Sequence, residues 1–288
     1  MELVVSAGIV TYNPDLRLLM QNIQSVMPQV DWLIVCDNGS ENVVQIEECL
    51  NEMRSSRMLL IKNEENRGIA FALNRIMQKS LELKASWTIT LDQDSIVPQD
   101  LVASNREAMM AGKDLAIISC VIHDRNEIHR QPERDERVKY SEIETCITSA
   151  SLTNVEAWRK LGGFDELMFI DNVDIEYCLR ARRAGYRILR NNTVVLSHAI
   201  GNIKEKKLLG RWLTVRNHSP MRKYYQIRNI LYMHYKLYGR LSMEVLYRVL
   251  AAYFKVIFYE QDKARKIHEM NRGILDGFKY GRKARANR

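Results

Sequence analysis

The sequence predicts an α/β fold: a Rossmann-like, mostly parallel sheet with flanking helices, followed by a C-terminal helical segment. Two observations support this prediction. Across the first two hundred of the 288 residues, short apolar runs rich in β-branched side chains alternate with helix-length amphipathic segments. Elements that alternate in this way form a parallel sheet with helices on both faces. Beyond residue 203 the chain becomes basic and aromatic, and residues 220–260 are helical in character.

The individual elements follow in chain order. Strands are expected at 3–10, 32–36, 58–61, 87–91, 115–119 and 193–196, and helices at 16–27, 43–54, 69–83 and 101–111, where apolar residues recur at helical spacing. The segment 120–150 is charged, and we expect an irregular, mobile excursion there. Residues 153–156 form a capping box before a short helix that stops at Gly162-Gly163, and a further helix ends at Gly185.

Charge divides the chain into two predicted domains. Residues 204–288 contain 21 Lys and Arg against 6 Asp and Glu, whereas residues 1–203 contain 22 against 29. We therefore expect a catalytic or binding domain at 1–203 and a basic, aromatic helical region at 204–288. A basic region of this kind faces an anionic partner.

Three further features predict the cellular compartment of the protein. The five cysteines are odd in number and include no Cys-x-x-Cys pair, which is typical of a reduced compartment. The N-terminus has no basic stretch before its first strand, which argues against a signal peptide. The longest apolar stretch, 246–259, contains Arg248 and Lys255, so no spanning helix is expected. The sequence thus predicts a cytoplasmic protein.

Two aspartates, Asp92 and Asp94, follow directly on the apolar run at 87–91. Such a run is typical of a buried parallel strand, and ligands of open α/β sheets collect at the carboxyl ends of these strands. Carboxylates there suit Mg²⁺ or Mn²⁺, which share their ligand shell with substrate phosphates. The alternative is an acidic turn, because a single Asp-x-Asp triplet is common.

Six motifs occur in order between residues 3 and 200. They are Val10-Thr11-Tyr12-Asn13-Pro14, Cys36-Asp37-Asn38-Gly39-Ser40, Asn66-Arg67-Gly68-Ile69-Ala70, Leu91-Asp92-Gln93-Asp94-Ser95, Gly162-Gly163-Phe164-Asp165-Glu166 and Phe169-Ile170-Asp171-Asn172-Val173-Asp174-Ile175-Glu176. In wording and order they resemble the motifs of family 2 glycosyltransferases, which have the GT-A fold. The fourth and sixth motifs, with the later Arg-x-Tyr-Tyr-x-x-Arg-Asn at 222–229, resemble the rhamnosyltransferase subgroup.

This resemblance implies a site for a nucleoside-diphosphate sugar. The residues it assigns to the nucleotide are Thr11, Tyr12, Asn13, Asp37, Asn38, Asn66, Arg67, Gly68 and Asp92. Asp37 is expected to accept the N3–H that thymine and uracil both offer. Asp37-Asn38-Gly39-Ser40 is also a good turn sequence, so a purely structural turn is the alternative.

The same resemblance assigns a divalent cation, Mg²⁺ or Mn²⁺, to the diphosphate. Asp94 is the expected direct ligand, and Asp92 lies nearer the ribose or reaches the ion through water. His198, at the end of the predicted strand 193–196, is the third candidate ligand. A structural histidine is the alternative for His198, because a lone histidine is more often structural than a ligand.

Catalysis is expected at a helix start. By resemblance Asp174, six residues before Arg180, is the general base for the acceptor hydroxyl, and Glu176 matches a following acidic position. A helix N-terminus stabilises the carboxylate anion, which keeps it available as a base. N-terminal capping by Asp171 or Asp174 is compatible with this role. Most family members have Glu before the aspartate, whereas this chain has Val173, so the acceptor contacts stay open. One base and no evident nucleophile predict inversion at the anomeric carbon.

Together these features predict an inverting, metal-dependent transferase of L-rhamnose from dTDP-rhamnose to a cell-surface polysaccharide or lipid-linked acceptor. Another donor, such as a UDP-sugar, is the alternative. A processive synthase is disfavoured because Leu208 replaces the glutamine before Arg211-Trp212, and a nucleotidyltransferase because its glycine-rich loop is missing.

The basic segment at 204–288 is expected to lie on the anionic inner face of a membrane, because basic and aromatic helices bind such surfaces. No nucleic-acid-binding motif is present. A solvated helical face, a homo-oligomer contact and a non-catalytic lipid- or nucleic-acid-binding module are the alternatives.

Overall fold

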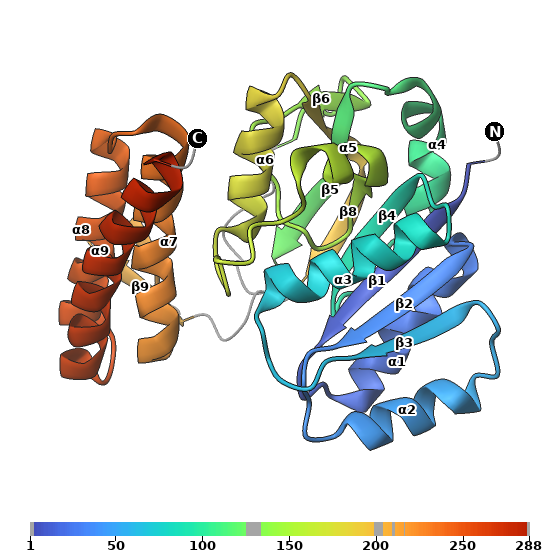
Figure 1. Cartoon of the computed structure of the whole chain (residues 1–288), viewed down its shortest axis with the longest axis horizontal. Coiled ribbons are helices and arrows are strands. Elements are labelled where there is room, and N and C mark those ends of the chain that lie inside the picture. The colour runs from blue at the N-terminus through green and yellow to red at the C-terminus, as the bar shows by residue number, and fades with distance from the viewer. Residues whose placement is uncertain (1–2, 125–133, 199–203, 209–210, 216, 287–288) are drawn as a thin grey trace. The chain divides into compact units, whose positions relative to one another are not determined.

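The computed structural model describes residues 3–124, 134–198, 204–208, 211–215 and 217–286 (Figure 1). The chain divides into two compact units. The first comprises Met1–Leu167 and Val173–Ala199, and the second comprises Met168–Asn172 and Ile200–Arg288. A short segment of the first two hundred residues, 168–172, thus belongs to the unit of the C-terminal region.

In the described part of the first unit, eight strands form one mixed sheet in the order β3-β2-β1-β4-β7-β5-β8-β6. The strands are β1 (Val5–Thr11), β2 (Trp32–Asp37), β3 (Met58–Lys62), β4 (Trp87–Asp92), β5 (Leu115–Asp124), β6 (Tyr140–Glu142), β7 (Ser151–Asn154) and β8 (Arg187–His198). Strands β3, β2, β1 and β4 are parallel, as are β5 and β8. Only β7 and β6 run antiparallel to their neighbours in this sheet. The predicted mostly parallel sheet is confirmed.

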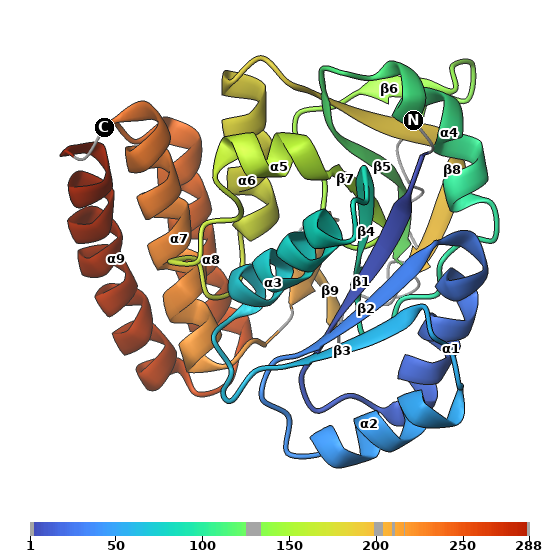
Figure 2. The ribbon, with the colours of Figure 1, turned by 45° about the vertical axis from the view of Figure 1, so that its right-hand side comes forward.

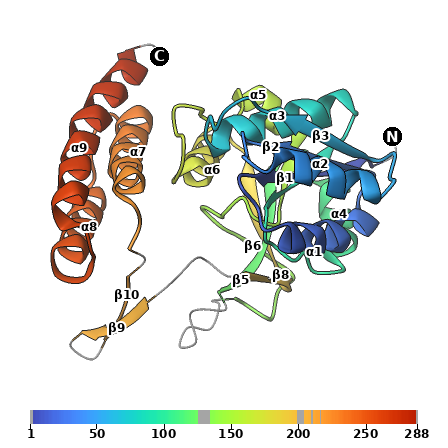
Figure 3. The ribbon, with the colours of Figure 1, turned by 90° about the horizontal axis from the view of Figure 1, so that it is seen from below.

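Helices cover both faces of this sheet, with α3 and α5 on one side of the strands and α1 and α4 on the other (Figure 3). They are α1 (Leu16–Val26, followed by a 3₁₀ turn at Met27–Gln29), α2 (Val43–Glu52), α3 (Ile69–Glu82), α4 (Leu101–Ala111), α5 (Val155–Leu161) and α6 (Val173–Arg183). Helices α1, α2 and α4 share one apolar core with the strands. Helix α3 lies directly on β1, because a Cβ at Gly8 would come within 2.1 Å of Ile76 Cγ2.

Most predicted elements are present within a few residues of their expected bounds, and α4 coincides with the prediction. Two expectations were wrong. Thr153 does not open a capping box, because it is buried in β7; Asn154 caps α5 by accepting a hydrogen bond from Ala157 N at 3.0 Å. The segment 120–150 is partly regular, since β5 extends to Asp124 and β6 lies within it. Residues 125–133 of that segment lie outside the described residues.

The described part of the second unit holds a β-hairpin and a group of helices that lie side by side (Figure 2). The hairpin pairs β9 (Lys204–Leu208) with β10 (Arg211–Val215), and the helices are α7 (Pro220–Tyr238), α8 (Met243–Tyr259) and α9 (Lys263–Ala286). The helices were predicted, whereas the hairpin was not. No helix in the described ranges combines the length and apolar character needed to cross a membrane.

A glycine stripe on α9, formed by Gly273, Gly277 and Gly281, faces α7. A Cβ at these positions would come within 2.7 Å of Tyr224 O, 2.8 Å of Leu231 Cβ and 2.7 Å of Tyr235 Cβ, respectively. The four-residue spacing places all three glycines on one helix face. They therefore allow the backbones of α7 and α9 to approach closely.

A buried ion cluster joins the ends of the three helices. Glu260, at the end of α8, accepts a hydrogen bond from Lys223 Nζ of α7 at 2.6 Å and from Lys266 Nζ of α9 at 2.9 Å. All three side chains are at least nine-tenths buried. Both lysines lie near helix N-termini, where a carboxylate is favourable. The cluster holds these three helix ends together.

Candidate functional site

Three polar residues end neighbouring strands at one edge of the sheet. Thr11 ends β1, Asp37 ends β2 and Asp92 ends β4. The register pairs Thr11 with Asp37 and Val10 with Asp92. In the sheet, β2 and β3 lie on one side of β1, and β4 lies on the other side. The order of the strands therefore changes direction at β1. Ligands of open α/β sheets bind at such a point.

Asp37 is fully buried and organises the turn after β2. Its carboxylate accepts hydrogen bonds from Thr11 Oγ1 at 3.0 Å, from the backbone nitrogens of Gly39 at 3.2 Å and Ser40 at 2.9 Å, and from Ser40 Oγ. Four hydrogen bonds are as many as a carboxylate usually accepts. A nucleotide base N–H at Asp37 must therefore replace one of these donors, and that contact stays a prediction.

The loops after β2 and β3 are joined to each other. Asn38 Nδ2 donates to Asn66 Oδ1 at 3.0 Å and to Gly68 O at 3.2 Å, and Asn66 Oδ1 also accepts from Gly68 N at 3.0 Å. Gly39 has φ +80°, and a Cβ there would lie 2.6 Å from the backbone carbon of Glu65. Asn38, Asn66 and Gly68 thus shape the loops at the strand ends, whatever contact they make to a nucleotide.

Two of the predicted nucleotide-binding side chains are exposed. Tyr12 is 47% exposed, and its backbone nitrogen donates to Gln93 Oε1 at 2.9 Å. Arg67 is exposed and stacks its guanidinium on the Phe71 ring, 3.8 Å from the centroid. Asn13 adopts φ 46° and donates from its backbone nitrogen to Ser40 Oγ at 2.8 Å. Tyr12 and Arg67 are accessible to a ligand, while Asn13 braces the loop.

The Asp-x-Asp pair lies where β4 gives way to a turn. Asp92 is half-buried, and Asp94 is exposed in the turn. The fully buried Asn22 of α1 donates from Nδ2 to Asp92 O at 2.6 Å and thereby holds this backbone. Sequence reasoning missed Asn22. Its signal is an amide on the apolar face of a helix, beside Leu19 and Ile23.

Metal ligands are only partly described. The described residues contain no group of three or more His, Cys, Asp or Glu side chains able to hold a metal ion. His198 ends β8, paired in register with Asp124, and its side chain lies outside the description. Asp92 and Asp94 lie two residues apart where β4 ends, and their roles and that of His198 as metal ligands stay predictions.

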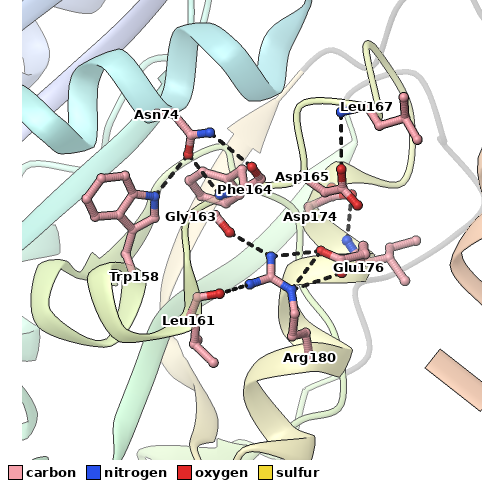
Figure 4. Close-up of polar contacts among 11 residues, drawn as sticks. Asn74, Trp158, Leu161, Gly163, Phe164, Asp165, Leu167, Asp174, Glu176 and Arg180 are labelled. Carbon is pink, nitrogen blue, oxygen red and sulfur yellow. Dashed lines mark hydrogen bonds and ion pairs between the residues drawn. The ribbon is translucent and has the colours of Figure 1, made fainter. Parts of the chain in front are cut away.

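A second polar cluster joins α6 to the glycine motif that follows α5 (Figure 4). The buried Glu176 accepts from Arg180 Nε at 2.9 Å and from Arg180 Nη2 at 2.9 Å. The same guanidinium donates to the carbonyl oxygens of Leu161 and Gly163. Burial acts to lower the pKa of Arg180, but the hydrogen bonds and charge of Glu176 outweigh burial and raise it. This pair is structural.

Asn74 of α3 holds the same glycine motif from the other side (Figure 4). Its Oδ1 accepts from Trp158 Nε1 at 3.1 Å and from Phe164 N at 2.8 Å, and its Nδ2 donates to Phe164 O at 2.9 Å. Gly163 has φ +80°, and a Cβ there would lie 2.9 Å from Asn74 Oδ1. The motif Gly162-Gly163-Phe164 is thus fixed between α3, α5 and α6.

The three carboxylates around the start of α6 differ in their partners. Glu176 is fully buried against Arg180, and Asp171 forms an ion pair with Arg222 at 3.1 Å. Asp174, in the first turn of α6, is half-buried and accepts from Ile175 N at 2.9 Å. Glu176 and Asp171 each have an arginine partner, and the role of Asp174 as the general base stays a prediction.

Two of the cysteines, Cys36 and Cys120, do not offer a nucleophile. All five are free, and burial raises the pKa of both Cys36 and Cys120 to about 12. A thiolate is the reactive form of cysteine. These two residues therefore act as small apolar side chains of the core.

Comparisons with known proteins agree with this architecture. The model of the family described as glycosyl transferase family 2 matches residues 6–164. The dTDP-rhamnosyl transferase RfbF of Shigella flexneri is 28% identical over 94% of this chain and 93% of its own length.

Two solved structures share the fold. GalNAc-T7, solved with UDP, GalNAc and Mn²⁺, has a TM-score of 0.66 at 14% identity, and the match covers 99% of this chain but only 57% of that one. The mannosyltransferase PcManGT of Pyrobaculum calidifontis, solved with GDP-Man and Mn²⁺, has a TM-score of 0.58 at 14% identity, over 96% and 86% of the two chains. These likenesses confirm the GT-A fold expected from the motifs. The family model covers more than half of the chain, and the chain therefore belongs to glycosyl transferase family 2 and is a glycosyltransferase.

Proposed function

We propose that this protein is an inverting, metal-dependent rhamnosyltransferase. It transfers L-rhamnose from dTDP-rhamnose to a saccharide or lipid-linked acceptor of a growing cell-surface polysaccharide. The observation that carries the chemistry is the meeting of Thr11, Asp37 and the Asp92-x-Asp94 pair at one edge of the sheet. The choice of donor rests on the relative named as a dTDP-rhamnosyl transferase, which matches along nearly the whole chain.

The residues present suit a divalent cation that is shared with a diphosphate. Asp94 is exposed in the turn after β4, and Asp92 is half-buried at the strand end. The described residues offer two carboxylates here and no complete set of protein ligands. Mg²⁺ is usually bound in this way, by one or two carboxylates and by the phosphates of the substrate. When bound, Mg²⁺ or Mn²⁺ would neutralise charge on the leaving nucleoside diphosphate. Asp94 would be the direct ligand, with Asp92 and His198 as further candidates.

The chain's own residues divide the remaining work. The exposed Tyr12 and Arg67 bind the nucleotide beside the loop that Asp37 and Asn38 hold in shape. Asp174 accepts the proton of the acceptor hydroxyl as that oxygen forms its bond to the anomeric carbon. The leaving oxygen departs from the opposite face in the same step, so the configuration inverts.

The donor is tested by measuring nucleoside-diphosphate release from purified protein over a panel of sugar nucleotides, with and without Mn²⁺. We expect release from dTDP-rhamnose to exceed release from dTDP-glucose, UDP-glucose, UDP-GlcNAc and GDP-mannose, and to stop in EDTA. Preference for a UDP-sugar would show that the assignment of the donor is wrong, while the protein would still be a glycosyltransferase. Release that persists in EDTA would contradict the metal dependence.

We further propose that the enzyme works on the cytoplasmic face of an anionic membrane, where lipid-linked acceptors are located. Helix α8 is apolar on two faces: Val245, Val249 and Val256 are buried, and a second stripe is exposed. The exposed stripe consists of Met243, Leu246, Tyr247, Leu250, Phe254, Ile257 and Phe258. An exposed apolar stripe on a helix is typical of a membrane or protein contact.

Charge favours lipid over a second copy of the chain. Residues 217–286 contain 15 Lys and Arg against 5 Asp and Glu, so two copies repel each other while an anionic surface attracts each of them. Attraction to such a surface is worth about 1 kcal/mol per nearby Lys or Arg.

Sedimentation with vesicles of phosphatidylglycerol or of phosphatidylcholine tests the membrane proposal. Binding should require the anionic lipid and weaken in high salt. Phe254→Asp should reduce it, whereas Met110→Asp, an exposed apolar control on α4, should not. Equal binding to both lipids would contradict the proposal. So would a dimer in ultracentrifugation that Phe254→Asp dissociates, since the stripe would then join two copies.

A further inference from the structure

Two cysteines of the first unit lie in contact, although they are 32 residues apart in the chain. Cys146 follows β6 in the loop 143–150, and Cys178 lies in the middle of α6. Their Sγ atoms are 3.8 Å apart, and Cys178 Sγ also lies 3.9 Å from Cys146 O. Both thiols are free. A contact of this length leaves no room for another atom between the two sulfurs.

A small movement would turn this contact into a disulfide. The two sulfurs of a disulfide are about 2.0 Å apart, so the pair has to close by roughly 1.8 Å. Cys146 belongs to neither a helix nor a strand, and its backbone is therefore not held by the regular hydrogen bonds of either. The loop side of the pair can supply most of the movement.

The two thiols differ in access to solvent. Cys146 is half-buried, whereas Cys178 is fully buried. The hydrogen bond with Cys146 and burial together raise the pKa of Cys178, which keeps that side chain a thiol. Oxidation starts at an accessible sulfur, and a neighbouring cysteine then resolves the product. Cys146 is therefore the residue at which an oxidant enters, and Cys178 is its resolving partner.

The loop that carries Cys146 also contacts the turn after β4. Ser149 Oγ shares a hydrogen bond with Ser95 Oγ at 2.7 Å, and both side chains are buried. Ser95 directly follows Asp94, the proposed metal ligand. The loop 143–150 thus connects the turn of the Asp-x-Asp pair to α6.

On the helix side, Cys178 lies one turn after Asp174. A spacing of four residues places both side chains on the same side of α6. The negative charge of Asp174 contributes to the raised pKa of Cys178, after the hydrogen bond with Cys146 and burial. A bond formed at Cys178 would therefore pull on the part of α6 that carries Asp174.

We propose that Cys146 and Cys178 form a reversible disulfide, with hydrogen peroxide as the oxidant. Cys146 sulfur attacks the peroxide and becomes a sulfenic acid, and one water leaves. Cys178 sulfur then attacks Cys146 sulfur, the S–S bond forms, and the sulfenic oxygen leaves as a second water. Thiol reductants reverse the bond by exchange. The disulfide draws loop and helix together, displaces Asp174 and lowers the rate of transfer; this last effect rests on the proposed function, in which Asp174 is the base.

Mass spectrometry of tryptic digests tests the disulfide. Cys146 and Cys178 fall in separate tryptic peptides, 140–159 and 161–180. The folded protein is treated with hydrogen peroxide, and the remaining thiols are blocked before digestion. We expect the two peptides to be linked, with a mass two hydrogens below their sum, and to separate in dithiothreitol. Cys49→Ser, which changes a half-buried cysteine of α2, should form the same link.

The kcat of the same samples measures the effect on turnover. A small displacement of a catalytic group can cost about 10²-fold in rate, and we expect a loss of that order in oxidised wild type. Dithiothreitol should restore this loss, whereas methionine oxidation needs an enzyme for its reversal. Cys146 is half-buried, so Cys146→Ser should fold, and its kcat should be normal before and after peroxide.

The outcomes separate this proposal from the proposed function, because the peptide link is measured by mass and needs no activity. No link in the folded protein, or a link from Cys146 to Cys120, would overturn the disulfide. A link that leaves kcat unchanged, or an equal reversible loss in Cys146→Ser, would overturn its effect on transfer. Near-normal turnover in Asp174→Asn would instead overturn the base assignment and leave the disulfide in place.

Discussion

Three carboxylates from the two units differ in burial and in partners. In the first unit, Asp94 after β4 is exposed and Asp174 at the start of α6 is half-buried, whereas Glu260 in the second unit is buried between two lysines. A buried carboxylate must be paired, because an unpaired buried charge costs several kcal/mol. An accessible carboxylate can instead meet a ligand. Burial therefore separates the acids proposed to act from an acid that holds the fold.

The largest effect is expected at the most exposed of these acids. Asp94→Ala should abolish transfer and metal-dependent donor binding, because it removes the proposed direct ligand of the cation. The melting temperature should stay within a few degrees of wild type, since Asp94 is exposed in a turn. Titration of dTDP-rhamnose with and without Mn²⁺ measures this, with Glu52→Ala, an exposed acid of α2, as the control. Normal Mn²⁺-dependent binding would refute the ligand assignment.

A smaller loss is expected at the start of α6. Asp174→Asn should keep donor binding and lower kcat by about 10²–10⁴-fold, the usual contribution of a general base. Glu176→Gln sharpens the comparison, because this buried partner of Arg180 should lower the melting temperature instead. Steady-state kinetics and thermal melts on both variants make the distinction. Turnover of Asp174→Asn within a few-fold of wild type would transfer the base role to another acid.

In the second unit the same kind of change should act on stability. Glu260→Gln leaves Lys223 and Lys266 buried with a neutral partner, and breaking a buried pair costs about 3–5 kcal/mol. Urea unfolding measures this, with Glu244→Gln, an acid of α8 whose side chain is 73% exposed, as the control. Equal unfolding free energies for the two variants would show that the cluster does not hold the helix ends.

The smallest effect is the pH dependence of that cluster. Burial alone would raise the pKa of Glu260, but the hydrogen bonds of Lys223 and Lys266 outweigh it and lower the pKa below 4.5. A lowered folded-state pKa means that the carboxylate stabilises the fold above pH 4.5, and that this stabilisation is lost as the pH falls through the folded-state value. Unfolding free energies at pH 7 and pH 4 should therefore differ more in wild type than in Glu260→Gln. Identical pH dependence would contradict the assignment.

The sequence predicted the sheet and the position of Thr11, Asp37 and Asp92 at one edge of it, because both depend on local pattern. Apolar runs gave the strands, and the residues after them had to lie at one edge of a parallel sheet. The sequence could not show that Asp37 is saturated by four internal donors, because this depends on how one turn folds back on itself. The contacts of Asn22, and those of Arg222 and Asn229 with residues 170–171, were missed because the partners are 70 and 51–59 residues away in the chain.

The glycine stripe of α9 has a consequence for the stability of that helix. Glycine lowers the intrinsic stability of a helix interior by about 1 kcal/mol per residue, so Gly273, Gly277 and Gly281 make α9 a poor helix on its own. The close approach to α7 that they permit is what compensates. Helix α9 therefore depends on its contact with α7 for stability, and residues 263–286 are expected to be a poor helix as an isolated peptide.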